Sequence, residues 1–171
     1  MINLPNELSL ILTTLSKTQE ITVTAKPLLE AESEEYLAYR LSLNNKNALF
    51  RKAKITPKKI GQFVTLWKRP TAHDEIAPFD KTDEIEWIII NASEKNFTGY
   101  FIFNQELLFQ KNIFSYDKKN GKRALRVYPP WSLPTSAQAL KTQKWQLPFF
   151  IDLNQNETAV IEKVKKLFKK K

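Results

Sequence analysis

The chain has 171 residues, of which 42% are hydrophobic and 26% are charged, with only 3 glycines and a formal net charge of +9. This length fits one domain, residues 1–171, and the composition excludes a disordered or glycine-rich chain. The lack of cysteine excludes disulfides, thiolate metal sites and cysteine nucleophiles, and it suits the cytoplasm, where we expect the protein.

The N-terminal segment predicts a helix from about residue 5 to residue 17. Leu8, Ile11 and Leu15 recur at helical spacing after Pro5, which suits a helix start. The apolar run is too short and too interrupted to span a membrane, and no basic segment precedes it. We therefore expect neither a membrane span nor a secretion signal.

Runs of β-branched and aromatic residues predict strands through the middle of the chain. These runs cover residues 36–43, 48–55, 61–69, 84–92, 97–104 and 123–131. The first two are expected to form a hairpin, because the asparagines between them tolerate left-handed turn conformations. Residues 84–92 and 97–104 are expected to form an antiparallel pair.

Two helices are expected after these strands. Thr135, followed by Gln138, resembles a capping box and opens a helix that runs through Trp145. Amphipathic spacing predicts a lysine-rich terminal helix over residues 156–171. The expected fold is α/β (α+β), with a central mixed sheet flanked by helices.

Charge is segregated along the chain. Acids are absent from Tyr36 to His73 and again from Lys118 to Ile151. Opposed charges normally intersperse on a soluble surface, so blocks of one sign indicate an anionic partner, and nucleic acid is the leading candidate. We expect both blocks to lie on one concave face. For Lys118, Lys119 and the terminal lysines we prefer a solvated surface without a binding role.

Four motifs follow one another through the chain. They are FRxAKxTPxKxGQFVxxWKR from Phe50, PFD from Pro78, GKRAxRVYPPW from Gly121 and KTQxWQ from Lys141. In this order they resemble the MepB-like family of small bacterial proteins. The resemblance implies a single α/β domain that is restriction-endonuclease-like in outline, and nucleic-acid binding rather than a proven enzymatic activity.

The candidate nucleic-acid contacts are cations and polar side chains fixed on or beside the expected strands and helices. They are Arg51, Lys54, Lys59, Gln62, Lys68, Arg69, Arg123, Arg126, Tyr128, Lys141 and Gln143. Trp131 or Trp145 could stack a base. DNA and RNA both fit such a site, and no cofactor is required.

The alternative is a nuclease that depends on Mg²⁺ or Mn²⁺. Asp80, Asp83 and Glu86 could supply its carboxylates. The strand at 97–104, however, lacks the E-x-K triplet that such a site needs, so Lys68 or Lys54 would have to replace the missing lysine. We therefore expect binding without catalysis. A third class, a small-molecule or protein-binding module, would be indicated by acids in the groove.

Overall fold

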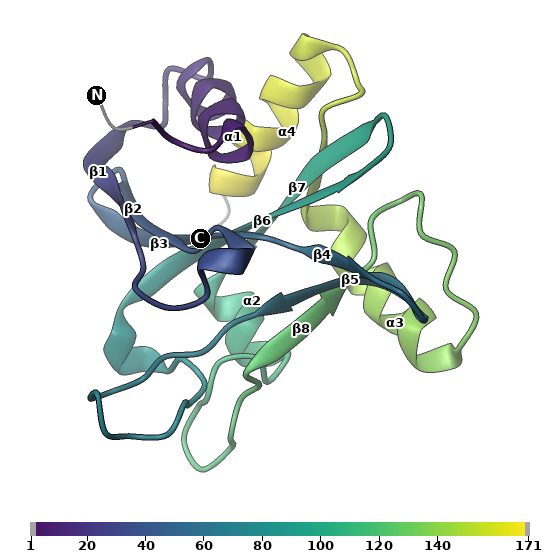
Figure 1. Ribbon diagram of the computed structural model, residues 1–171. Coiled ribbons are helices and arrows are strands. Elements are labelled where there is room, and N and C mark those ends of the chain that lie inside the picture. Colours follow the sequence, from purple (N-terminus) through teal and green to yellow (C-terminus); the bar gives the residue numbers. More distant parts are fainter. Residues whose placement is uncertain (1–2, 170–171) are drawn as a thin grey trace.

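In the computed structural model, which describes residues 3–169, a six-stranded mixed sheet forms the middle layer (Figure 1). In spatial order its strands are β1 (Val23–Leu29), β2 (Tyr39–Leu43), β3 (Lys46–Lys52), β6 (Ile85–Glu94), β7 (Phe97–Asn104) and β9 (Phe150–Asp152). Strands β3 and β6 are parallel, and the other neighbouring pairs are antiparallel. The expected mixed sheet with helices is confirmed.

A second, three-stranded sheet lies below the first in Figure 1. It consists of β4 (Lys54–Thr56), β5 (Lys59–Thr65) and β8 (Ala124–Val127), all antiparallel. The expected strand at 48–55 is thus divided between two sheets. The backbone N–H of Ala53 still donates to Asn91 O at 2.9 Å, and after that bond the chain leaves the large sheet.

Helices α1 (Asn6–Ser16) and α4 (Glu157–Lys169) cover the other face of the six-stranded sheet (Figure 1). The remaining helices are α2 (Gln105–Gln110), α3 (Ala137–Gln146) and the short 3₁₀ segments η1 (Glu34–Tyr36), η2 (Lys81–Asp83) and η3 (Leu147–Phe149). The predicted terminal helices are confirmed, although residues 170–171 lie outside the described residues. No helix within residues 3–169 is long and apolar enough to cross a membrane.

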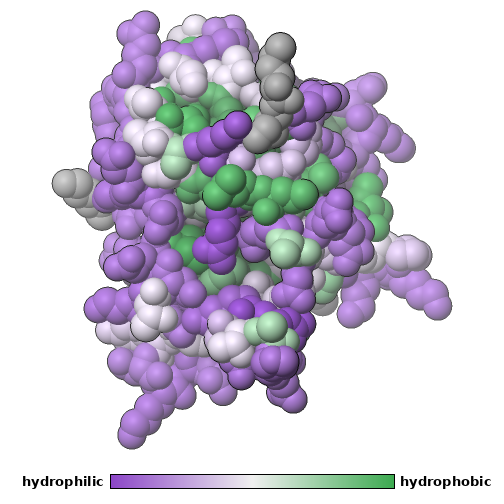
Figure 2. All heavy atoms as spheres, turned by 60° about the vertical axis from the view of Figure 1, so that its left-hand side comes forward, coloured by the Kyte–Doolittle hydropathy of each residue, from purple (hydrophilic) through white to green (hydrophobic). Residues whose placement is uncertain are grey.

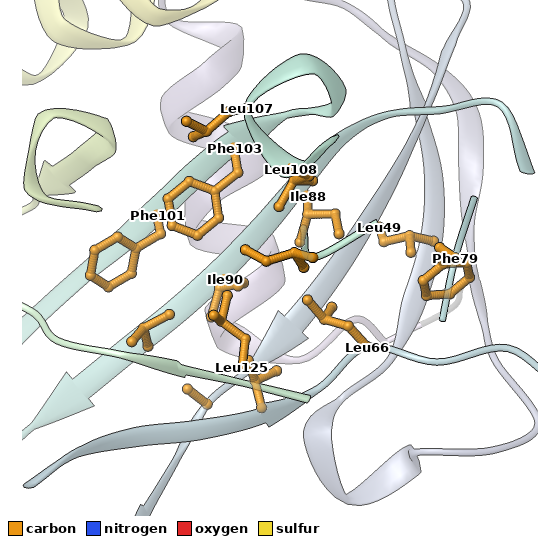
Figure 3. Close-up of a cluster of buried hydrophobic side chains, with 14 of the residues drawn as sticks. Leu49, Leu66, Phe79, Ile88, Ile90, Phe101, Phe103, Leu107, Leu108 and Leu125 are labelled. Carbon is orange, nitrogen blue, oxygen red and sulfur yellow. The ribbon is translucent and has the colours of Figure 1, made fainter. Parts of the chain in front are cut away.

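The large sheet buries apolar side chains on both faces. On β6, Ile88 and Ile90 point toward the small sheet, while Ile89 points toward α1 and α4, because successive strand residues face opposite sides. Figure 3 shows Leu66 and Leu125 of the small-sheet side packed against Ile88 and Ile90. The small sheet is therefore fixed to the large one by a shared core.

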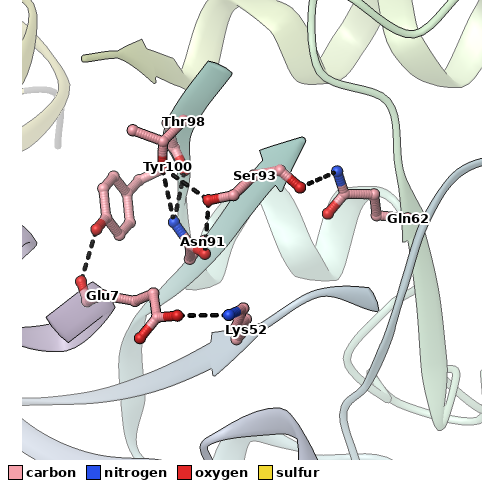
Figure 4. Close-up of polar contacts among 8 residues, drawn as sticks. Glu7, Lys52, Gln62, Asn91, Ser93, Thr98 and Tyr100 are labelled. Atoms are coloured by element: carbon pink, nitrogen blue, oxygen red, sulfur yellow. Dashed lines mark hydrogen bonds and ion pairs between the residues drawn. The ribbon is translucent and has the colours of Figure 1, made fainter. Parts of the chain in front are cut away.

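A buried polar network also joins the layers (Figure 4). The side chain of Gln62 on β5 donates to Ser93 O on β6 at 3.2 Å, which links the two sheets. On the opposite face, the hydroxyl of Tyr100 donates to Glu7 O at 2.6 Å, and Lys52 pairs with the Glu7 carboxylate. Burial raises the pKa of Tyr100, so its hydroxyl remains a hydrogen-bond donor to α1.

Candidate nucleic-acid interface

A cleft of about 480 Å³ lies where the β4–β5 turn, β8 and α3 meet. Four cations line it: Lys58 and Lys59 from the first acid-free block, and Lys122 and Arg126 from the second. We call this cleft the basic groove. Its remaining lining is neutral and consists of Ile60, Ala124, Leu125, Tyr128, Pro134, Thr135, Ser136, Gln138, Ala139 and Thr142.

Strand pairing brings the two acid-free blocks together. Phe63 of β5 lies opposite Arg126 of β8 in the antiparallel register. The guanidinium of Arg126 donates to Gly61 O at 3.2 Å and lies over the ring of Phe63 at 5.8 Å. Gly61 has φ +84°, and a Cβ there would come within 2.7 Å of the Tyr128 ring. Glycine at this turn lets Tyr128 line the groove.

Helix α3 is held against β8 by two glutamines. The fully buried Gln146 accepts from the N–H of Tyr128 at 2.9 Å and donates to Arg126 O at 3.0 Å, as a neighbouring strand would. Gln143 donates to Ser132 O at 2.9 Å and also to Pro129 O at 3.1 Å. These bonds satisfy backbone N–H and C=O groups at the end of β8, where Pro129 and the following proline end the strand pairing.

The four groove cations have no ion pair within residues 3–169, and no acid lines the groove. Unpaired cations in a concave surface concentrate positive potential there. The helix α3 begins in the same groove, with Ser136 accepting from the N–H of Ala139 at 3.1 Å. The positive end of the helix dipole adds to this potential.

In contrast, the cations of the first acid-free block that lie before and after the β4–β5 turn are paired with acids. Lys54 lies 3.0 Å from Glu35, and Arg69 lies 3.1 Å from Glu32. Arg69 borders a separate cleft that contains Glu32. We therefore correct the expectation that Lys54, Lys68 and Arg69 share a concave surface with Arg126, because none of the three lines the basic groove and each is paired with an acid.

That separate cleft adjoins β1, one of the two edge strands of the large sheet. Leu28 and Leu29, which are exposed, line it together with the acids Glu30 and Glu32. Figure 2 views the side of the molecule that carries β1, and hydrophobic side chains there lie among hydrophilic ones. Carboxylates in this cleft disfavour phosphate contacts.

Arg51 is also corrected, because its side chain is only 1% exposed. It lies on β3, an interior strand of the large sheet that is paired with β2 on one edge and β6 on the other. Its Nη1 donates to Glu30 at 2.9 Å and to Phe50 O at 2.9 Å. Burial lowers the pKa of Arg51, while the Glu30 carboxylate opposes that shift. Arg51 is part of the interior and is not available to a phosphate.

Lys68 joins two of the three candidate metal ligands. Its Nζ lies 3.0 Å from Asp80 and 2.8 Å from Asp83. Burial acts to lower the pKa of Lys68, but hydrogen bonds to Asp83 and Asp80 outweigh burial and raise it. Burial likewise acts to raise the pKa of Asp80, but hydrogen bonds from Thr82 and Lys68 outweigh it and lower that pKa. The cluster closes the turn at η2, where Asp80 and Asp83 form a capping box.

Glu86, the third candidate carboxylate, has other partners. Lys46 lies 3.5 Å from one of its oxygens, and the side chain of Gln105 donates to the other at 2.9 Å. Within residues 3–169 there is no cluster of three or more His, Cys, Asp or Glu side chains suited to a metal ion.

Other predicted contacts have structural partners or lie outside the groove. Gln62 is 2% exposed and Gln143 is bonded to backbone carbonyls, and neither lines the basic groove, so their expected phosphate contacts there are corrected. Arg123 and Lys141 are exposed but do not line the groove. Trp145 packs against the core.

Sequence reasoning missed three residues around the groove: Lys58, Lys122 and Gln146. Both lysines stand beside predicted contacts within the acid-free blocks, so block membership was the available signal. Gln146 follows Gln143 by three residues on the same helix face. Two glutamines at this spacing, following a predicted strand that contains Pro129, could have indicated side-chain amides that bond to the backbone at the end of that strand.

Comparisons with known proteins agree with this architecture. The family model described as MepB-like matches residues 30–152. A solved structure described as the crystal structure of MepB is similar to the chain, with 30% sequence identity and a TM-score of 0.74 over 89% of this chain and 99% of that one. No curated protein matches the chain. Because the family model covers most of the sequence, the chain belongs to the MepB-like family.

Proposed function

We propose that this protein binds nucleic acid in the cytoplasm, contacting phosphates with the basic groove. The observation that carries the proposal is the convergence of Lys58, Lys59, Lys122 and Arg126 in a cleft that no acid of residues 3–169 lines. Cations that neutralise phosphates release condensed counterions, which supplies much of the affinity of proteins for nucleic acid. Segregated positive charge of this kind is the electrostatic signature of such proteins.

Neutral groups of the groove can add hydrogen bonds to phosphate or sugar oxygens. Thr135, Gln138 and Tyr128 have side chains suited to this role. Phosphate contacts position a strand but carry no sequence information. The proposed binding therefore depends little on base sequence and accepts DNA or RNA.

Replacing Lys122 by glutamine should weaken binding of a short oligonucleotide about five- to tenfold at low salt, because one phosphate contact is lost. Replacing Lys54 by glutamine is the matched control, since Lys54 is a lysine of the other acid-free block that is paired with Glu35. Its effect should stay within about twofold. Fluorescence anisotropy of a labelled oligonucleotide measures both. Equal losses in the two variants would argue against the groove as the binding surface.

The second candidate function is a nuclease that depends on Mg²⁺ or Mn²⁺, with the restriction-endonuclease-like outline that the family resemblance implies. The approach of Lys68 to both Asp80 and Asp83 favours this candidate, because a lysine beside two carboxylates is what such a site requires. In this arrangement, however, the Lys68 ammonium itself bonds to one oxygen of each carboxylate. It therefore occupies positions that a metal ion would need.

We expect the purified protein to leave supercoiled plasmid and RNA intact in the presence of Mg²⁺ or Mn²⁺. The reason is that a divalent ion would have to displace Lys68 from Asp80 and Asp83. Gel electrophoresis after prolonged incubation measures this. Cleavage that disappears in the Asp83→Asn variant would overturn the expectation and establish the second function.

A further inference from the structure

We infer that the molecule has a pocket for one unpaired nucleobase beside the basic groove, so that its preferred ligand is a single strand. This inference rests on the proposed function. The pocket, which we call the base pocket, has a volume of about 300 Å³. It is lined by Ile55, Lys59, Ile60, Gly61, Gln62, Glu94, Trp131, Ser132 and Leu133.

The walls of the base pocket are apolar side chains exposed to solvent. Ile55 is 56% exposed, Ile60 is 46% exposed and Leu133 is 78% exposed. They come from β4, from β5 and from the loop after β8, and they converge on one cleft. Trp131 completes the wall and is held by ring stacking on Phe97, with centroids 5.3 Å apart and planes at 18°. Apolar and aromatic walls of this kind suit the face of a base.

Polar atoms in the lining suit the edge of a base. Gln62 lines the pocket and is 2% exposed, and its Oε1 is a buried acceptor without a hydrogen-bond partner among residues 3–169. The indole Nε1–H of Trp131 is a buried donor that also lacks a hydrogen-bond partner in the described part of the chain. Unsatisfied buried polar atoms are costly, so a ligand that offers complementary groups gains affinity. Bases present both N–H donors and acceptors along their edges.

Glu94 in the lining distinguishes the base from the phosphate. Its carboxylate repels a phosphate but can accept a hydrogen bond from an amino group or ring N–H of a base. The adjoining groove has the opposite character, since Lys59 and Arg126 line it without an acid. Phosphate is therefore favoured in one cleft and the neutral base in the other.

The two clefts share a wall. Lys59 and Ile60 line both the basic groove and the base pocket. A strand whose phosphates follow the groove can thus turn a base across Ile60 into the pocket. Bases of a duplex are stacked and paired, and they reach such a pocket only by costly extrusion, whereas unpaired bases are available. This placement favours single-stranded DNA or RNA.

The test compares three probes of equal length: a single-stranded oligonucleotide of mixed sequence, an abasic strand with the same phosphates, and a duplex. The native protein should bind the single strand about tenfold more tightly than either other probe, which is the size expected for one well-packed base. In the Ile55→Ala/Leu133→Ala variant this preference should disappear, while affinity for the abasic strand stays unchanged. Leu140→Ala is the matched control, because Leu140 is 48% exposed and lines neither cleft.

Three results would overturn the inference. Equal affinity for the base-containing and abasic strands, or for the single strand and the duplex, would contradict base binding in the pocket. Phosphate binding in the basic groove would still stand. A preference that survives in the Ile55→Ala/Leu133→Ala variant places base recognition elsewhere. Failure of all three probes to bind at low salt defeats the proposed function and the inference together.

Discussion

Replacing Arg51 by methionine is expected to lower the free energy of unfolding by about 3 kcal/mol. Arg51 is 1% exposed, and its guanidinium is the partner of Glu30 at 2.9 Å. Glu30 has a side chain only 16% exposed, so the substitution leaves a largely buried carboxylate without its main counter-charge. Methionine retains most of the apolar stem, so the loss reports the charge pair rather than a cavity. Urea unfolding measures this difference.

The companion variant Arg51→Met/Glu30→Gln removes both charges and should recover more than half of that loss, because no unpaired buried charge remains. Oligonucleotide affinity of the folded Arg51→Met protein should equal that of the native protein, since Arg51 does not reach the surface. Unchanged stability together with a large loss of affinity would show that Arg51 contacts phosphate after all.

The sequence predicted the elements whose patterns depend on local periodicity. Both antiparallel hairpins and both terminal helices occur where alternation and helical spacing placed them. Val64, Leu66, Ile88 and Ile90, apolar residues of the predicted strands at 61–69 and 84–92, are all at most 1% exposed. The adjacency of the two acid-free blocks was also predicted, and the pairing of β5 with β8 produces it.

The partition of the cations could not be predicted, because it depends on contacts between residues far apart in sequence. Arg51 and Lys54 belong to one basic run, yet Glu30 and Glu35 neutralise them, whereas Lys59 in the same run faces an acid-free groove. Nothing in a local pattern tells which lysine meets a carboxylate. Sheet order decides it, and sheet order arises from long-range pairing.

The division of residues 48–55 between two sheets was hidden for a similar reason. The run reads as one strand, since its composition is strand-like throughout. Ala53 is the buried residue at which the chain crosses from β3 to β4. Glycine and proline are the residues that usually signal a boundary between elements, and neither occurs at this crossing. Local composition therefore could not reveal it.

The salt dependence of binding is expected to reveal the groove cations directly. Each phosphate that a cation neutralises on a single strand contributes about −0.7 to the slope of log affinity against log salt concentration. Contacts from Lys58, Lys59, Lys122 and Arg126 should therefore give a slope of about −3. Affinity would then fall about 50-fold between about 50 mM and about 200 mM salt.

The triple variant Lys58→Ala/Lys59→Ala/Lys122→Ala removes three of these contacts and keeps Arg126, which also bonds to the backbone of the β5 turn. All three lysines are exposed and have no ion pair within residues 3–169, so folding should be unaffected. The control is Lys17→Ala/Lys46→Ala/Lys54→Ala, because each of these lysines already pairs with a glutamate. Its slope should match that of the native protein.

The most direct test of the basic groove as a phosphate-binding surface is the slope of log affinity against log salt concentration, measured by anisotropy for the native protein and both triple variants. We predict a slope of about −3 for the native protein and the control, and about −1 for the Lys58/Lys59/Lys122 variant. A flat native slope, or equal slopes in the two triple variants, would contradict phosphate binding in the groove.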